Sequence, residues 1–542
     1  MEEGRRDEAF ALWQELVACD AADTEALTAI GSLLRSSGRP HEALVPLREV
    51  TRLIPHDSCG WYNLGLAWYD MGRNDAARIC LDRCLHCNPQ YADALFAQGR
   101  VLMNLGMLQQ AHACLETLCK SHPNNERYRS SHLFCSLHMP DWPPERLVAL
   151  HRRWGDDFGH PDGQATCWDN EPDPDKILRI GYVSGDWYHH PVGWFLEPVL
   201  RAHDPETVEI YCYSDVVLAD EYTERFRTLA HRWNDCSAMS LCDSAAQVRR
   251  DRIDILVDCA GHTARRMLGL FALRPAPLQM SWLGYPATTG MQAMDYRIGD
   301  AVTDPRGAEQ WYVERIERPG GAFFPLPRPW EQVCVSPPPF EKNGYVTFGS
   351  THRLLRLNDE VLAAWGGVLN RCPGSRLLVF RDTLTEMSVT FLRERMLHQG
   401  LDTERVVFSS DPAEPDNLLS VYTRIDVALD TFPWSGHTMA CEALWCGVPV
   451  VTLKGALHAG RMVASLLAGC GLQELCTRTI PDYVGCAAAL AASPARIREL
   501  RRTLPGRLER SPLFDHAACT RSLEQVYRRV WKRYCEGTHA AC

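Results

Sequence analysis

The spacing of hydrophobic and polar positions changes twice along the chain, which divides it into three regions. Up to about residue 123, small and apolar residues recur with a period of 34 and follow helical spacing within each period. Residues 124–176 lose this period, and contain one helical stretch (144–156) and a Pro- and Asp-rich run. From residue 177 onward, short apolar runs alternate with helical stretches, which is typical of parallel sheets with crossover helices.

The period of 34 is visible as four ladders of equivalent residues. The ladders are Gly31, Gly65 and Gly99; Gly38, Gly72 and Gly106; Ala43, Ala77 and Ala111; and Pro55, Pro89 and Pro123. This spacing is typical of tetratricopeptide repeats, in which small residues allow paired helices to approach closely. The sequence therefore predicts about three and a half repeats over residues 1–123. Such an array either binds a polypeptide on its concave face or serves only packing and the contacts of a homodimer.

Ten candidate strands form two series, separated by a Pro-rich stretch at residues 325–339. They are residues 177–183, 208–213, 253–258, 278–283 and 295–298, followed by 345–349, 375–380, 405–409, 426–430 and 449–453. The sequence thus predicts two Rossmann-like α/β lobes, at 177–335 and 340–535, joined to the repeat superhelix by a helical connector at 124–176. No G-x-G-x-x-G follows these strands, so a nicotinamide cofactor is not indicated.

Candidate chemistry lies after the strands, because ligands of open α/β sheets bind beyond the carboxyl ends of the strands. Asp186 and His190 follow the first strand, and such a pair either acts as a general base near neutral pH or simply caps the next helix. Backbone groups near Gly284 could approach a ligand closely. Arg353 and Arg356 either bind phosphate in fork geometry or lie on a solvated face.

The most specific segment follows residues 426–430 and opens a helix. It consists of Ser435, Gly436, His437 and Thr438. The free N–H groups and the positive dipole end of a helix N-terminus suit a diphosphate. Glu442, about one turn inside that helix, is placed to accept hydrogen bonds from a ribose diol. We expect this segment to bind a nucleotide.

Composition restricts the function classes further. The 542 residues are 46% hydrophobic and 23% charged, which excludes collagen-like, disordered and disulfide-scaffold proteins. A net charge of −11 argues against non-specific nucleic-acid binding but allows a local basic pocket. The 23 cysteines lack the paired spacing of a metal site, so buried reduced thiols are expected. Neither a signal peptide nor an apolar run of 18 residues is present, which fits a cytoplasmic protein without membrane contact.

Together these motifs resemble the O-GlcNAc-transferase-like glycosyltransferases, which fuse tetratricopeptide repeats to a two-lobed, metal-independent GT-B region using a UDP-sugar. The matching segments are residues 258–263, 271–279, 282–286, 294–296, 429–431, 436–438 and 444–447. The chain lacks the long insert between the lobes of the animal enzymes, so it looks like a bacterial member.

The resemblance implies roles for three candidate catalytic residues. His190 matches the family His of the active centre, once proposed as the base, and Asp186 matches an Asp that is another base candidate. Arg356 falls where the family usually has a Lys on the diphosphate, where it would stabilise the leaving UDP.

The resemblance also implies a donor-binding set. His437 and Thr438 match the His-Thr that binds uridine and phosphate. Glu442 falls at the family Asp that holds the ribose, and Leu283 and Gly284 match the backbone beside the sugar. Within this family, an inverting transfer of N-acetylglucosamine from UDP-GlcNAc to Ser or Thr hydroxyls of a polypeptide acceptor is expected, with no metal or other cofactor.

Three matters stay open at this stage. The hydroxyl proton could go to His190, Asp186 or a phosphate oxygen of the substrate. The donor could instead be GDP-fucose or UDP-glucose in the same fold. The chain could also be a repeat adaptor with a catalytically weakened region, because Arg353 departs from the family pattern and Leu418 stands where the family has a uracil-side His.

Overall fold

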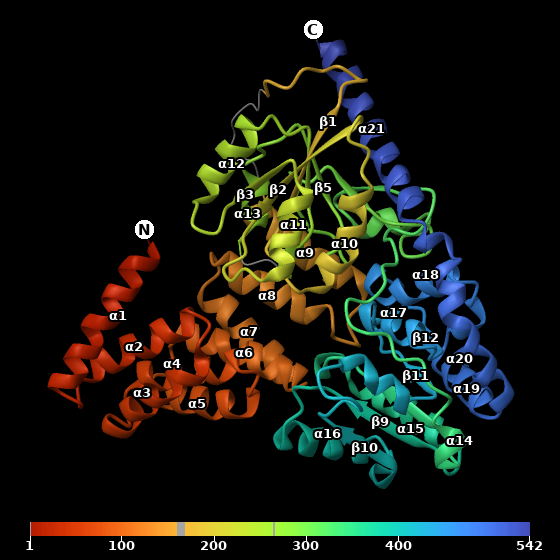
Figure 1. Cartoon of the computed structure of the whole chain (residues 1–542), viewed down its shortest axis with the longest axis horizontal. Helices are drawn as coiled ribbons and strands as arrows, with labels where there is room; N and C mark the ends of the chain where they lie inside the picture. Colours follow the sequence, from red (N-terminus) through yellow and green to blue (C-terminus); the bar gives the residue numbers. More distant parts are fainter. Residues whose placement is uncertain (1, 160–167, 264–265, 542) are drawn as a thin grey trace.

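The computed structural model describes residues 2–159, 168–263 and 266–541. In these ranges a helical array is followed by two parallel α/β lobes, which confirms the predicted fold class (Figure 1). The array lies beside the lobes, with its last helices against them, and the lobes are stacked one on the other.

Nine helices precede the first strand in the described part of the chain. They are α1 (Glu2–Cys19), α2 (Thr24–Ser36), α3 (Pro40–Leu53), α4 (Ser58–Asp70), α5 (Asn74–Cys87), α6 (Ala92–Asn104), α7 (Leu108–Ser121), α8 (Glu126–Ser136) and α9 (Pro144–Phe158). Gly31, Gly65 and Gly99 lie where paired helices cross, and a Cβ built on Gly31 would lie 2.4 Å from Leu47 Cγ. Gly106 ends its helix with a φ of 76°, which glycine adopts without strain.

The helical rhythm continues beyond residue 123. Helix α8 begins at Glu126, 34 residues after the start of α6 at Ala92. Sequence reasoning expected α9 but missed α8, because Leu133 and Pro140 occupy the positions where the ladders would place glycines. Helix α9 docks on the first lobe, where a Cβ on Gly155 would lie 1.7 Å from the carbonyl oxygen of Gly290.

The first lobe, called the N-lobe below, is a seven-stranded parallel sheet in the order β3-β2-β1-β4-β5-β6-β7. Its strands are β1 (Leu178–Ser184), β2 (Val208–Ser214), β3 (Arg232–Asp235), β4 (Ile255–Asp258), β5 (Leu278–Ser281), β6 (Tyr296–Ile298) and β7 (Arg315–Glu317). Its helices are α10 (Pro191–Ala202), α11 (Glu221–Leu229), α12 (Leu241–Arg250) and α13 (Leu268–Ala272).

The second lobe, the C-lobe, is a six-stranded parallel sheet in the order β10-β9-β8-β11-β12-β13. Its strands are β8 (Thr347–Ser350), β9 (Arg376–Phe380), β10 (Val406–Ser409), β11 (Val427–Leu429), β12 (Val450–Leu453) and β13 (Cys476–Thr477). Its helices are α14 (Phe340–Asn343), α15 (Asp359–Arg371), α16 (Glu386–His398), α17 (Thr438–Trp445), α18 (Met462–Gly469), α19 (Ile480–Ala491) and α20 (Pro494–Glu509). A last helix, α21 (His516–Ala541), runs back along the N-lobe (Figure 1).

All ten predicted strands are present, within two or three residues of the expected ends. The three that the sequence did not predict, β3, β7 and β13, are short and lie at sheet edges. An edge strand buries only part of its side chains, so it lacks the apolar run that marks a central strand in sequence.

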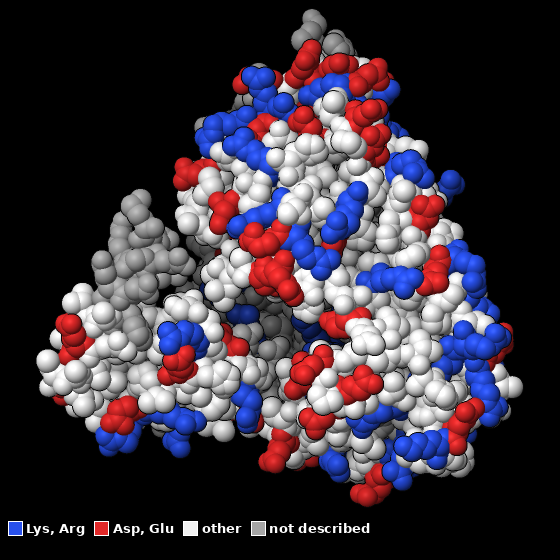
Figure 2. All heavy atoms as spheres, in the orientation of Figure 1, with Lys and Arg blue, Asp and Glu red and all other residues white. Residues whose placement is uncertain are grey.

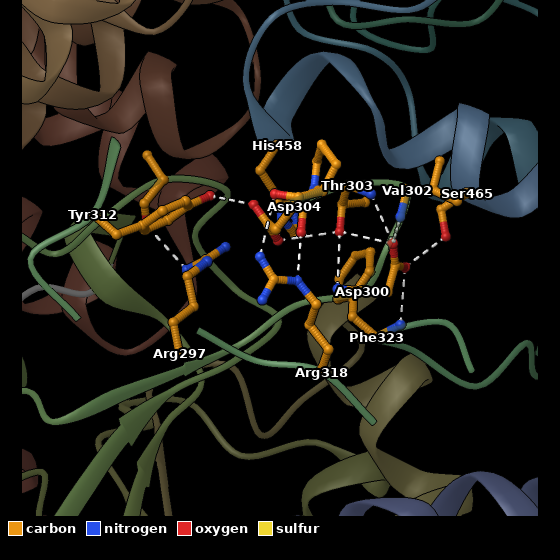
Figure 3. A network of polar contacts seen from close by, with 12 residues as sticks. Arg297, Asp300, Val302, Thr303, Asp304, Tyr312, Arg318, Phe323, His458 and Ser465 are labelled. Carbon is orange, nitrogen blue, oxygen red and sulfur yellow. Dashed lines mark hydrogen bonds and ion pairs between the residues drawn. The ribbon is translucent and has the colours of Figure 1, made fainter. Parts of the chain in front are cut away.

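Two buried carboxylates of the N-lobe fasten it to the C-lobe (Figure 3). Asp304 accepts hydrogen bonds from His458 Nδ1 at 2.7 Å and from the Tyr312 hydroxyl at 2.6 Å. Asp300 accepts one from the Ser465 hydroxyl at 2.6 Å. Burial raises the pKa of Asp304, but the attraction of His458 outweighs this and holds that pKa well below its usual range. The pair therefore contributes to holding the cleft between the lobes in one geometry.

We expect Asp304→Asn to lower the free energy of unfolding of the two-lobed region by about 3–5 kcal/mol, because it breaks a buried charge-assisted pair from one side. Urea denaturation followed by tryptophan fluorescence measures this. Glu474→Gln removes the exposed ion pair with Arg496, at 2.8 Å, and is the control, with an expected loss below about 1 kcal/mol. Equal midpoints for the two variants would contradict the assignment of Asp304 as a buried joint.

Candidate functional site

The loops that carry the predicted site residues meet between the lobes. The N-lobe contributes the loop from β1 to α10, and the C-lobe contributes the segments that follow β8, β9 and β11. The surface is hollowed where the repeat helices meet the two lobes, and Lys or Arg atoms lie inside the hollow (Figure 2). The net charge of −11 thus coexists with a basic cleft.

Asp186 and His190 lie close together in the loop from β1 to α10. His190 Nδ1 is 3.6 Å from Asp186 Oδ2, which is too long for a hydrogen bond. The same Nδ1 accepts a hydrogen bond from the Val192 amide at 3.3 Å, so His190 does cap α10. Because Nδ1 is an acceptor here, the proton of the neutral imidazole is on Nε2. His190 therefore offers a donor, not an acceptor, through Nε2.

Burial gives the two residues different protonation states. Burial raises the pKa of Asp186 to about 7, against the opposing charge of Arg353. Burial also lowers the pKa of His190 to about 4, with Arg353 and His189 lowering it further. At neutral pH the imidazole of His190 is therefore uncharged. The carboxyl of Asp186 is about half ionised, because its pKa lies near 7. Since Arg353 belongs to the C-lobe and acts on both groups, it faces this loop across the cleft.

Arg353 is one of three arginines, here called the arginine cluster, with Arg356 and Arg381. Burial lowers the pKa of Arg356 to about 9, and the charges of Arg353 and Arg381 contribute. Burial also lowers the pKa of Arg353, followed by the effect of Arg381. Sequence reasoning missed Arg381, although its place directly after the buried strand β9 was a signal. Three mutually repelling guanidinium groups at one cleft form a site for an anion.

Arg356 joins the segment after β8 to the segment that opens α17. It ends the 3-10 turn Leu354–Arg356, and its Nη1 donates to the carbonyl oxygen of Ser435 at 2.9 Å. The guanidinium carbon lies 5.2 Å from the ring centroid of Trp434. Arg356 is half-buried, so the solvated-face alternative does not describe it, whereas Arg353 is exposed at the cleft. Two predicted segments, 75 or more residues apart in sequence, are thereby brought to one place.

Two of the four predicted amide donors at residues 435–438 are already used within the protein. The Ser435 amide donates to the carbonyl oxygen of Ala459 at 2.9 Å, and the Gly436 amide donates to Asp430 Oδ1 at 2.7 Å. The expectation that all four amides face a ligand is therefore wrong for Ser435 and Gly436. These two residues shape the turn instead, and place the amides that follow.

His437 and Thr438 remain available at the start of α17, where the first N–H groups of a helix have no acceptor within it. Phe195 of the N-lobe stacks on the His437 ring with centroids 4.3 Å apart, and Phe324 meets the ring edge-on at 4.3 Å. Burial lowers the pKa of His437 to about 3, so its ring is neutral. Its Nε2 has no hydrogen-bond partner among the described residues. A buried unpaired nitrogen is costly, so this atom indicates a place for a ligand group.

Glu442 lies one turn into α17, half-buried, as the sequence predicts. Its Oε2 accepts a hydrogen bond from the Tyr422 hydroxyl at 3.3 Å. Burial raises the pKa of Glu442 to about 8, and the charge of Glu331 adds to this. The carboxyl is therefore mostly protonated at neutral pH in the absence of a group that donates hydrogen bonds to it.

The close backbone approach predicted at Gly284 is made by the protein itself. A Cβ on Gly284 would lie 2.1 Å from the carbonyl oxygen of Cys259, so packing between the loops after β4 and β5 explains the glycine. Leu283 has a φ of 62°, which is uncommon for a leucine. Such backbone strain collects at functional sites, and Leu283 remains a candidate on that ground.

His262, in one of the recognised motifs, has a packing role. It is buried, its Nε2 donates to the carbonyl oxygen of Thr289 at 2.9 Å, and its Nδ1 lies 3.1 Å from the Ser130 hydroxyl. Since Ser130 belongs to α8, this imidazole ties the connector to the N-lobe.

Residues 2–159, 168–263 and 266–541 contain no group of three or more His, Cys, Asp or Glu side chains that could hold a metal ion. The cysteines in these ranges are free thiols. No helix in the same ranges is both long and apolar enough to cross a bilayer.

Family models and a solved structure both match this chain. The model of glycosyl transferase family 41 matches residues 164–325 and 342–523, and tetratricopeptide models match residues 60–91 and 80–113. The solved structure of an O-GlcNAc transferase variant from Thermobaculum terrenum superposes with a TM-score of 0.89 at 35% identity. That match covers 96% of this chain and 99% of the other.

Several plant proteins are similar to this chain in sequence. The probable UDP-N-acetylglucosamine–peptide N-acetylglucosaminyltransferase SPINDLY of Solanum lycopersicum is 37% identical over 423 residues, which are 77% of this chain. The corresponding protein SEC of Arabidopsis thaliana is 30% identical over 67% of this chain. The chain spans only 45% and 38% of the lengths of these two relatives.

Proposed function

Because the chain belongs to glycosyl transferase family 41, we propose that it transfers N-acetylglucosamine from UDP-GlcNAc to Ser or Thr hydroxyls of proteins. The observation that carries this proposal is the anchoring of Arg356 at the opening of α17, inside a cleft lined by the arginine cluster. The plant relatives are named as UDP-N-acetylglucosamine–peptide N-acetylglucosaminyltransferases and the similar solved structure as an O-GlcNAc transferase, which supports this donor and acceptor class.

The proposed donor site uses the groups that the fold leaves available. Arg353 and Arg356, with the amides of His437 and Thr438, bind the diphosphate. Glu442 accepts hydrogen bonds from the ribose. The cationic side chains supply the charge that a metal ion would otherwise supply, so we propose a metal-independent transfer.

The proposed reaction is a single inverting displacement. The acceptor oxygen forms a bond to the anomeric carbon while the bond from that carbon to the phosphate oxygen breaks, and UDP leaves with its negative charge stabilised by Arg356. The hydroxyl proton goes to the carboxylate of Asp186, whose pKa of about 7 suits a general base. His190 donates a hydrogen bond from its Nε2–H to an oxygen of the sugar donor or of the acceptor, and so positions that substrate.

We further propose that the acceptor polypeptide reaches the cleft along the repeats. Helix α6 lies against the 3-10 turn of Arg356, since a Cβ on Gly106 would lie 3.0 Å from the carbonyl oxygen of Leu354. The later helices of the array therefore reach the edge of the proposed active site. Deletion of residues 1–123 should change which proteins of a lysate are modified; unchanged acceptor choice would contradict this role.

Transfer of radiolabelled sugar from UDP-GlcNAc onto lysate protein tests the proposed function. Calorimetry with UDP and GDP tests the nucleotide in parallel. Label on protein together with UDP binding is the expected result. Preference for GDP and transfer from GDP-fucose would assign another donor to the same fold. UDP binding without transfer from any donor would identify a repeat adaptor.

Glu442 predicts a pH dependence of nucleotide binding. A ribose diol favours the ionised carboxylate, and the free protein holds the pKa of Glu442 at about 8, so UDP affinity should rise as the pH increases from 7 to 8 and level off above. The pH range from 7 to 8 lies above the second ionisation of a phosphate group, at about 6, so the phosphate charge of UDP changes little across it. Calorimetric titrations at several pH values measure the slope, which approaches about tenfold per pH unit.

Two variants control this measurement. Glu442→Gln should weaken binding and remove the slope. Glu331→Gln removes the charge that raises the pKa of Glu442 and should move the rise to lower pH. A slope that persists in Glu442→Gln would show that another group titrates on binding.

A further inference from the structure

Trp434 lies between the connector helices and the arginine cluster. It is 6% exposed and sits in the loop from β11 to α17, directly before Ser435. One neighbour is His138, which follows α8, with ring centroids 4.3 Å apart and planes at 26°. Phe134 of α8 meets it edge-on at 5.5 Å. The guanidinium of Arg356 lies over the indole, 5.2 Å from its centroid. His138 and Arg356 thus both lie against the ring of Trp434.

Arg356 needs such support, because the other arginines repel it. Burial lowers the pKa of Arg356, the charges of Arg353 and Arg381 lower it further, and the opposing charge of Asp430 raises it. The one described hydrogen bond of its guanidinium group, to Ser435, uses Nη1 and leaves the other nitrogens of the fork free for an anion. The face of an indole attracts a guanidinium by its quadrupole and restricts the plane in which the fork lies.

His138 is suited to hold the indole of Trp434 in place. Its Nδ1 donates to the carbonyl oxygen of Phe134 at 3.0 Å, which fixes the ring. Burial lowers the pKa of His138 to about 3, and Arg356 and Arg353 lower it further, so the ring is neutral and adds no repulsion. The connector therefore supplies an uncharged aromatic backing to Trp434.

We propose that Trp434, clamped by His138, is a positioning residue that orients Arg356 toward the diphosphate of the nucleotide. The connector helices then belong to the nucleotide site as well as to the repeat array. This inference deepens the proposed function and rests on it. It assigns a role to a tryptophan that touches the phosphate-binding arginine but need not touch the reacting atoms.

The indole N–H offers an alternative role for Trp434, namely a direct hydrogen bond to the substrate, which can be tested. Trp434 Nε1 is buried and has no acceptor among the described residues. If this N–H bound the substrate directly, Trp434→Phe would be as harmful as Trp434→Ala. If the ring face orients Arg356, as we infer, Trp434→Phe should keep much of the effect, because phenylalanine also presents a π face, although a weaker one.

The experiment measures binding of three probes, namely UDP, inorganic pyrophosphate and uridine, to the full chain and its variants. Trp434→Ala should weaken UDP and pyrophosphate about tenfold, Trp434→Phe about threefold, and neither should change uridine affinity. His138→Ala should weaken the two phosphate probes more than His138→Phe. In an Arg356→Ala background, Trp434→Ala should add less than about twofold, because the two residues act as one unit.

The repeats offer a matched control. Arg48 lies over Trp68 at 5.1 Å, a similar pair outside the cleft, and Trp68→Ala should leave all three affinities unchanged. Equal loss of uridine and UDP in Trp434→Ala, or no loss of either phosphate probe, would overturn the inference. If the wild-type chain binds pyrophosphate but no UDP, the proposed function fails. The ratio of pyrophosphate affinities between the wild-type chain and Trp434→Ala still decides the role of Trp434. If it binds neither, both fail.

Discussion

Replacing Arg356 with alanine should reduce sugar transfer by about 10²–10³-fold, the cost of removing one preorganised group that stabilises developing charge. The leaving UDP gains negative charge as its bond to the sugar breaks, and Arg356 is anchored by Ser435 beside that position. UDP affinity should also fall, since the same guanidinium binds the diphosphate in the ground state. Steady-state transfer rates together with calorimetry separate the two effects.

Arg356→Lys distinguishes charge from geometry. Lysine keeps the charge but loses the planar fork and the stacking on Trp434, so we expect an intermediate loss. Arg405 is a matched control, because its guanidinium also donates to backbone carbonyl oxygens, at 2.9 Å to Ser375 and 2.7 Å to Cys372, but before β10, at the amino ends of the strands. Arg405→Ala should lower stability without changing UDP affinity. Wild-type transfer by Arg356→Ala would remove it from the proposed mechanism.

The sequence could predict what depends on local pattern. Central strands are buried on both faces and read as apolar runs, so the nine central strands of the described sheets were all predicted, together with the edge strand β10. The helix pairs followed from glycines such as Gly31, whose neighbour Leu47 leaves no room for a Cβ. Residues placed directly after strands, such as Arg353 and Arg356, were identified because the carboxyl edge of a parallel sheet collects ligand groups.

What the sequence could not predict depends on long-range contacts. The amides of Ser435 and Gly436 looked free, but Ala459 and Asp430 accept from them, and neither pairing leaves a trace in local spacing. Trp434 could be recognised as a support for Arg356 only once α8 was placed against it, since nearly 300 residues separate it from His138. Protonation states likewise follow from burial in the assembled cleft.

Asp186 and His190 illustrate that last point, and their separation predicts the second large effect. Both residues were base candidates in sequence, but the structure makes Nδ1 of His190 an acceptor for Val192 and keeps the ring neutral. Asp186, with a pKa of about 7, is left as the group that can take a proton at neutral pH. Asp186→Asn should therefore reduce kcat by about 10²–10⁴-fold while UDP affinity changes little.

The pH profile identifies the proton acceptor independently of the size of the loss. A carboxyl must be ionised to act as a base, so wild-type kcat should rise with pH through about 7 and then level off. His190→Ala should lower the rate but keep this rise, whereas Asp186→Asn should abolish it. Asp215, after the neighbouring strand β2 and paired with Arg266 at 2.9 Å, is the matched control, and Asp215→Asn should keep the rise. Retention of the wild-type rate in Asp186→Asn would remove Asp186 as the proton acceptor and leave a phosphate oxygen of the donor as the alternative.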